Sequence, residues 1–195
     1  MRFETKKIST KWKTVNKRKV WPEKAMHGED FAIYRVFDFL SSRGLIGYVL
    51  ENGSYVDDMI KEFYCNLPVH CDNSFSPKYH KVFVRGKIYD FSPALIRQAW
   101  GLNESEQYIN DEGVNMGLVM DTVTGGKIKK WSAKMKLVKL TSLCGVLQKI
   151  ATTNWVPSTN PSYLTSETGI FLFKLMKGVP VDLASRVFES ICAYS

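Results

Sequence analysis

Two adjacent aspartates, Asp57 and Asp58, are the residues in this sequence that most suggest chemistry. Adjacent carboxylates at a tight turn after an apolar strand can hold magnesium for phosphoryl transfer, as in a polymerase active site. Here the preceding Gly53-Ser54 is typical of a helix start rather than of a strand. We therefore interpret the pair as the first turn of a helix, where the helix dipole favours acidic side chains.

Thiol and imidazole side chains gather between residues 65 and 80. The set consists of Cys65, His70, Cys71 and His80. Structural zinc sites show paired short spacings such as Cys-x2-Cys, and this set has none, so we expect no metal site. No Gly-x-Ser-x-Gly elbow is present, and Gly125-Gly126-Lys127 lacks the remaining residues of a phosphate loop. We expect no enzyme activity, no catalytic residues and no cofactor.

The net charge of +8 is concentrated near the N-terminus. Residues 1–24 hold nine basic residues against Glu4 and Glu23, so this segment alone carries +7. Within it, basic side chains interleave with tryptophan, as a phosphate-binding arm with stacking side chains requires. The candidate nucleic-acid-binding residues are Lys11, Lys13, Lys17, Arg18, Lys19, Trp12 and Trp21.

A second basic stretch, residues 127–139, contains six lysines and no acidic residue. Basic patches alone have low specificity, because they are also typical of a solvated tail and a polar loop. Both interpretations, nucleic-acid contact and plain solvation, stay open from the sequence.

Apolar periodicity predicts the elements that would position these residues. Helices are expected over 29–43 and 54–67 (capped by Ser54), from Ser92-Pro93, from Thr141, and after Asp182. The buried side of the helix after Ser92-Pro93 is expected to consist of Leu95, Ile96, Ala99 and Trp100. Residues 164–177 are apolar nearly all round, which predicts a central buried helix. Residues 103–131 show little pattern.

Residues 79–91 change to an alternating pattern. The change predicts a β-hairpin that turns at Arg85-Gly86 and places Lys81 opposite Asp90. The predicted fold class is α+β and predominantly helical, with about five helices, one β-hairpin (about 79–91) and a flexible basic N-terminal arm.

The predicted domain organisation is a basic flexible arm over residues 1–28 and a single globular domain over 29–195. The chain stops inside its last predicted helix, so we expect a longer parent protein or a C-terminal truncation. No apolar run is long enough for a signal peptide or a membrane span. We expect a soluble intracellular protein with no membrane partner, and Lys17-Arg18-Lys19 is compatible with nuclear import.

Three blocks of the sequence, in this order, resemble a known family. They are Glu62-Phe63-Tyr64-Cys65-Asn66-Leu67, the stretch from Val82 to Pro93, and Leu147–Ala151 followed by Asn154-Trp155-Val156-Pro157-Ser158. The blocks are similar to the plant transposon protein domain, also described as the envelope-like protein of plant LTR retrotransposons. The resemblance covers about residues 31–192. It implies a plant mobile-element origin and brings no catalytic residues to carry over.

The sequence thus favours a non-enzymatic, transposable-element-derived binding module that contacts nucleic acid through the basic arm. The alternative is a protein–protein or assembly module of a retroelement particle, with self or other element-encoded proteins as partners and an inert basic tail. A decayed enzyme fragment is the third hypothesis and the least favoured.

Overall fold

The computed structural model describes most of the chain in ordered segments. These are residues 6–20, 36–46, 49, 53–102, 111, 113–128, 130–131, 135–155 and 162–193. Contacts divide the chain into two compact units, each described by itself below. Unit 1 comprises Met1–Glu23, Asn52–Gly101 and Ala184–Ser195, and unit 2 comprises Lys24–Glu51 and Leu102–Leu183.

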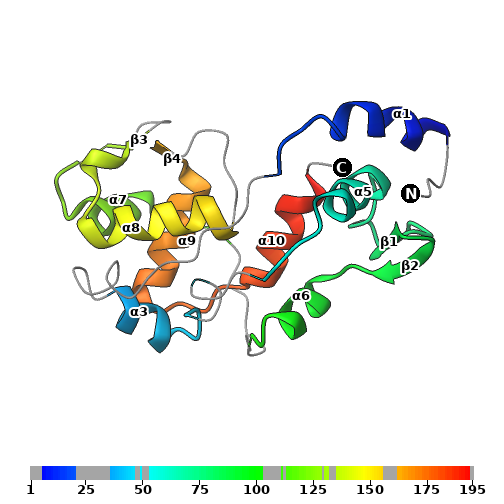
Figure 1. The fold of residues 1–195 in the computed structure, drawn as a ribbon. Coiled ribbons are helices and arrows are strands. Elements are labelled where there is room, and N and C mark those ends of the chain that lie inside the picture. The colour runs from blue at the N-terminus through cyan, green and yellow to red at the C-terminus, as the bar shows by residue number, and fades with distance from the viewer. Residues whose placement is uncertain are drawn as a thin grey trace. The chain divides into compact units, whose positions relative to one another are not determined.

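Unit 1 combines helices with one β-hairpin (Figure 1). Its elements are α1 (Lys6–Val15), α5 (Asp57–Asn66), β1 (Lys81–Val84), β2 (Lys87–Asp90), α6 (Pro93–Ala99) and, from its second residue on, α10 (Leu183–Cys192). The antiparallel strands pair Lys81 with Asp90 and Val84 with Lys87, which confirms the predicted hairpin and its register. Arg85 and Gly86 both adopt positive φ in the turn, as a tight two-residue hairpin requires.

One apolar cluster holds unit 1 together. It consists of Leu67, Cys71, Val82, Val84, Phe91, Phe188 and Cys192, with Phe63, Tyr64, Ile96 and Ile191 packed against it. The rings of Phe63, Phe91 and Phe188 lie in a row, with neighbouring ring centroids 5.0 Å apart. The cluster therefore joins α5, the hairpin and α10, although these segments are far apart in the sequence.

Unit 2 is built around α9 (Ser166–Lys177), which packs against α7 and α8 (Figure 1). Its other elements are α3 (Val36–Ser42), α7 (Met116–Thr124), β3 (Met135–Lys136), a 3-10 turn (Leu137–Lys139), α8 (Ser142–Ile150), a π-helical turn (Ala151–Trp155) and β4 (Tyr163–Leu164). Phe171, Leu172 and Leu175 are buried on α9, so the prediction of a buried helix over 164–177 is confirmed in its essentials.

The predicted count of about five helices and one hairpin is wrong. The described residues contain eight α-helices and two small two-stranded sheets, the second formed by β3 and β4. The sequence reading missed α1 and α7. Helix α7 has the periodic apolar residues Met116, Val119, Met120 and Val123, but it is short and lies within residues 103–131, for which no helix was predicted.

The helix starts that local sequence signals predict are confirmed for α6 and α8, and the predicted cap of α5 is wrong. The Ser92 side chain accepts a hydrogen bond from the backbone N–H of Leu95, and Thr141 accepts one from Cys144, so both predicted starts are confirmed. Helix α5 instead begins at Asp57 after Val56, which makes no side-chain cap, so the predicted cap at Ser54 is wrong. On α6, the predicted burial of Leu95 and Ala99 is wrong, since both are exposed, whereas Ile96 is partly buried against the unit 1 cluster.

The predicted flexible arm is wrong over residues 6–20. Residues 6–15 form α1, and α1 packs against α5 (Figure 1). The predicted boundary between residues 28 and 29 lies outside the described residues, as does the 29–35 portion of the predicted helix 29–43. A single domain over 29–195 stays a prediction.

Candidate nucleic-acid interface

Helix α1 has an apolar stripe that explains why it packs against α5. Ile8, Trp12 and Val15 follow the i, i+4, i+7 spacing of one helix face. Val15 is buried at 8% exposure, while Ile8 and Trp12 are half-buried. This spacing is present in the sequence, but the basic and polar residues around it favoured the prediction of a flexible arm.

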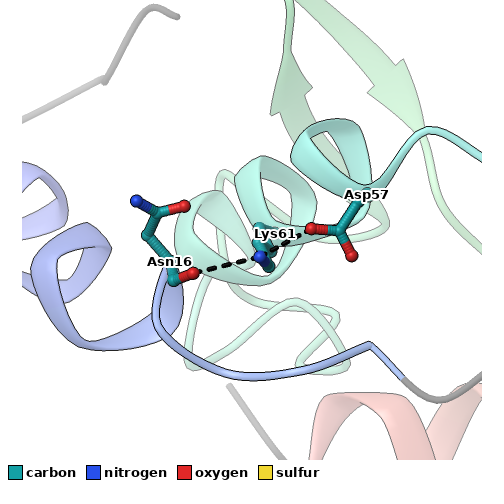
Figure 2. Close-up of polar contacts among 3 residues, drawn as sticks. All are labelled: Asn16, Asp57 and Lys61. Carbon is teal, nitrogen blue, oxygen red and sulfur yellow. Dashed lines mark hydrogen bonds and ion pairs between the residues drawn. The ribbon is translucent and has the colours of Figure 1, made fainter.

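A polar relay fastens the end of α1 to α5 (Figure 2). The Lys61 ammonium donates a hydrogen bond to the backbone carbonyl of Asn16 at 3.0 Å and pairs with the Asp57 carboxylate at 2.6 Å. Asp57 lies one turn before Lys61 on α5, the spacing at which opposite charges meet on a helix. The Lys61 side chain is only 12% exposed, so the relay is largely shielded from water on the lysine side.

The exposed cations lie on α1 and immediately after it. Lys13, Lys17, Arg18 and Lys19 are exposed, and we call these four side chains the α1 basic surface. Residues 6–20 contain seven basic residues and no acidic one. The carbonyl that Lys61 holds belongs to the residue just before Lys17. The relay therefore positions the start of the Lys17–Lys19 run.

The other candidate residues have different surroundings. Lys11 and Trp12 are half-buried on α1, and Trp21 lies outside the described residues. Burial raises the pKa of the Cys65 thiol on α5, and the positive charges of Lys11 and Arg18 act in the opposite direction. These two cations are thus close enough to α5 for their fields to reach Cys65, as the docking of α1 requires. A stacking role for Trp12 or Trp21 stays a prediction.

The charge is distributed unevenly between the two units. Unit 1 has fifteen basic and eight acidic residues, whereas unit 2 has twelve and eleven. The second basic stretch lies in unit 2, where Lys127, Lys130 and Lys136 are exposed. These lysines give a matched set for experiments, because they have the same charge and exposure without belonging to the α1 basic surface.

Asp57 and Asp58 lie in the first turn of α5, as interpreted from the sequence. The polymerase-type arrangement requires carboxylates at a strand turn, and this geometry is different. Asp57 instead orients Lys61, a structural role that the sequence reading did not assign.

The thiol and imidazole side chains between residues 65 and 80 make separate contacts. The Cys71 sulfur lies 2.8 Å from that of Cys192, and the His80 ring stacks on Tyr79 with centroids 3.7 Å apart. Across the part of the chain that the structure describes, no three histidine, cysteine or acidic side chains gather closely enough to hold a metal ion. The absence of a metal site in the whole chain stays a prediction.

Sequence reasoning missed one buried polar contact altogether. Glu62 is fully buried on α5; its Oε1 accepts a hydrogen bond from the Arg85 backbone N–H at 3.0 Å, and its Oε2 lies 3.4 Å from Arg85 Nε. Arg85 occupies the hairpin turn in the left-handed region, with φ +52°. The contact joins the first two sequence blocks that carry the family resemblance, so their co-occurrence has a structural reason.

The fold and this surface define a small, mainly helical protein with a basic face on one unit. Its sequence matches the family of the plant retrotransposon-related domain over residues 41–193, and the chain therefore belongs to that family. This confirms the predicted relationship to plant mobile elements. No curated protein and no solved structure matches the chain.

The region that matches the family contains only part of the candidate interface. Helix α5 lies inside the matched region and α1 lies outside it. Among the described helices, none combines the length and apolar character needed to cross a bilayer.

Proposed function

We propose that the chain is a non-enzymatic binding module of a plant retroelement, and that it contacts the phosphate backbone of nucleic acid through the α1 basic surface. One observation carries the proposal: four exposed cations lie within seven residues, with no acidic residue among them. One is on α1 and three directly follow it, and α1 packs against α5. Several fixed cations can displace condensed counterions from a polyanion together, which is the main source of sequence-independent affinity.

Docking supports the proposal in a second way. A flexible tail loses conformational entropy when it binds, whereas the backbone of a docked helix, and of the residues held directly after it, has already lost part of that entropy. The relay from Asp57 through Lys61 to Asn16 holds the backbone that enters the Lys17–Lys19 run. We expect such a surface to bind more tightly than the same residues in an unstructured peptide.

Removing the cations of the Lys17–Lys19 run should weaken nucleic-acid binding. The triple variant Lys17→Gln, Arg18→Gln, Lys19→Gln should bind a short fluorescein-labelled single strand at least about tenfold more weakly at low salt, because three phosphate contacts are lost. Each contact contributes about 0.7 to the slope of log affinity against log salt on single strands, so the slope should become shallower by about 2. Fluorescence anisotropy on RNA and DNA strands of one sequence measures both quantities.

The matched control is the unit 2 triple variant Lys127→Gln, Lys130→Gln, Lys136→Gln. It changes the net charge by the same amount, and its affinity should fall by less than about threefold if the α1 basic surface is the site. Equal losses in the two triple variants would mean that net charge alone drives binding and would refute the proposed site. Salt-insensitive binding in the wild type would refute phosphate contact altogether.

A second prediction tests whether the relay positions the surface. Asp57→Asn makes the protein more positive, so net charge alone would tighten binding. We expect instead that affinity falls by about twofold, because an ion pair of this kind contributes only a few tenths of a kcal/mol to holding Lys61 in place.

Asp58→Asn is the control for that variant. It removes the same charge from the same first turn of α5, so its effects on net charge and on the helix dipole are alike. Asp58 is not the ion-pair partner of Lys61, so binding should stay unchanged or tighten slightly. If both asparagine variants shift affinity in the same direction by the same factor, the relay has no positioning role.

A further inference from the structure

Two cysteines from distant parts of the chain meet inside unit 1. Cys71 lies in the turn after α5, Cys192 is the last residue of α10, and their sulfur atoms are 2.8 Å apart. Cys71 is 0% exposed and Cys192 is 8% exposed. A disulfide bond needs the two sulfur atoms about 2.0 Å apart, so they have less than about 1 Å to move.

The backbone around Cys71 is held in place. The Cys71 N–H donates to the Pro68 carbonyl at 3.1 Å, and the Cys71 carbonyl accepts from the His80 N–H at 2.8 Å. On the other side, Phe188 of α10 packs edge-on against the His80 ring, with centroids 5.2 Å apart. Both cysteines belong to the apolar cluster of unit 1, so packing fixes the position of each sulfur.

We propose that Cys71 and Cys192 are a built disulfide site, and that a low-molecular-weight disulfide oxidant such as oxidised glutathione closes it. One cysteine sulfur, as its thiolate, attacks a sulfur of the oxidant, forms a mixed disulfide and releases one small thiol. The second cysteine sulfur then attacks the protein sulfur of that mixed disulfide and releases the other small thiol. The protein loses two protons and two electrons, and the oxidant is reduced to two thiols.

The surroundings of the pair determine how fast the bond forms. Burial raises the pKa of both thiols, and for Cys192 the contact with Cys71 raises it further. The reactive thiolate is therefore scarce at neutral pH, and oxidation of the closed protein is slow. Its rate should increase with pH, and also when α10 is loosened by mild denaturant.

The bond would connect parts of unit 1 that are separate in the chain. Cys71 belongs to Asn52–Gly101 and Cys192 to Ala184–Ser195, and 121 positions separate them. A cross-link over so long a separation restricts the unfolded chain strongly. Oxidation should therefore lock α10 onto the α5–hairpin part of unit 1.

The other two cysteines are internal controls. Burial raises the pKa of the Cys144 thiol to about 12, and Cys65 is buried on α5. Among the described residues, the short sulfur–sulfur contact is the one between Cys71 and Cys192, and neither Cys65 nor Cys144 takes part in it. A double variant, Cys65→Ala with Cys144→Ala, keeps the proposed pair and removes every competing thiol.

The test is oxidation of the full chain with excess oxidised glutathione at mildly alkaline pH, followed by mass spectrometry. We expect a mass lower by two hydrogen atoms, a proteolytic fragment joining Cys71 to Cys192, and a thermal midpoint raised by roughly 10 °C that returns after reduction. The Cys65→Ala, Cys144→Ala variant should behave in the same way, and Cys71→Ala with Cys192→Ala should show neither the fragment nor the shift. Glutathione adducts without a cross-link, or cross-links through Cys65 or Cys144 instead, would overturn the proposal.

Discussion

Replacing Arg85 with alanine should lower the free energy of unfolding of unit 1 by about 2 kcal/mol. Glu62 is fully buried, so its carboxylate depends on the Arg85 backbone N–H and guanidinium for compensation. Breaking a fully buried ion pair costs about 3–5 kcal/mol, because a charge is left without its partner. The Arg85 side chain is 42% exposed, so water screens part of the loss and the smaller figure applies.

A double-mutant cycle separates this contact from other effects of the substitution. Glu62→Ala alone leaves the Arg85 backbone N–H without its acceptor, and should cost about 1–3 kcal/mol. The double variant should lose less than the sum of the single variants, with a coupling energy of about 1–2 kcal/mol. Lys87→Ala, next to the same turn and exposed, should change stability by less than about 0.5 kcal/mol.

Urea unfolding of fluorotryptophan-labelled protein, monitored by 19F NMR, measures these free energies of unfolding for each unit. Trp12 and Trp100 report on unit 1, while Trp131 and Trp155 report on unit 2. Strict additivity of Glu62→Ala and Arg85→Ala would contradict a direct energetic link between α5 and the hairpin turn.

The second large effect is expected in unit 2, where Asp111→Ala should cost about 2–3 kcal/mol. Lys174 lies on the central helix α9 with its side chain 5% exposed, and its ammonium pairs with the Asp111 carboxylate. Removing the carboxylate takes its negative charge away from the buried Lys174 ammonium. The buried positive charge is then less well compensated, which destabilises the folded state. Asp111 itself is partly exposed, which limits the loss.

The complementary variant should behave differently. Lys174→Met removes the buried charge and keeps a chain of similar length, so its cost should stay below about 1.5 kcal/mol. The Trp155 signal in unit 2 follows both variants, because Trp155 packs against Phe171 on α9. If Lys174→Met destabilises unit 2 more than Asp111→Ala does, burial of the ammonium is not what makes this pair important.

Features that depend on a few neighbouring residues could be predicted from the sequence. The hairpin register follows from alternation around Arg85-Gly86, and the starts of α6 and α8 follow from hydroxyl caps at Ser92 and Thr141. The burial of α9 follows from a run that is apolar on nearly every side. In these cases the local preference and the tertiary environment agree.

Features that depend on long-range contacts could not be predicted in this way. The contacts of Lys61 with Asn16 and of Glu62 with Arg85 join residues 45 and 23 positions apart, and no local pattern indicates which acid finds which partner. Helix α1 is an intermediate case. Its stripe of Ile8, Trp12 and Val15 is present in the sequence, but the polar and basic composition of residues 1–30 favoured the prediction of a flexible arm. Packing against α5 supplies the stabilisation that the isolated segment lacks.

The central claim is that the basic segment is a docked helix rather than a mobile tail. Hydrogen exchange at the backbone amides of Asn16 and Arg18, which donate to the carbonyls of Trp12 and Val15, tests it most directly. In the full chain these amides should exchange at least about tenfold more slowly than in a free peptide of residues 1–24. Equal rates in the chain and the peptide would show that α1 is not docked, and the fixed α1 basic surface would have to be abandoned.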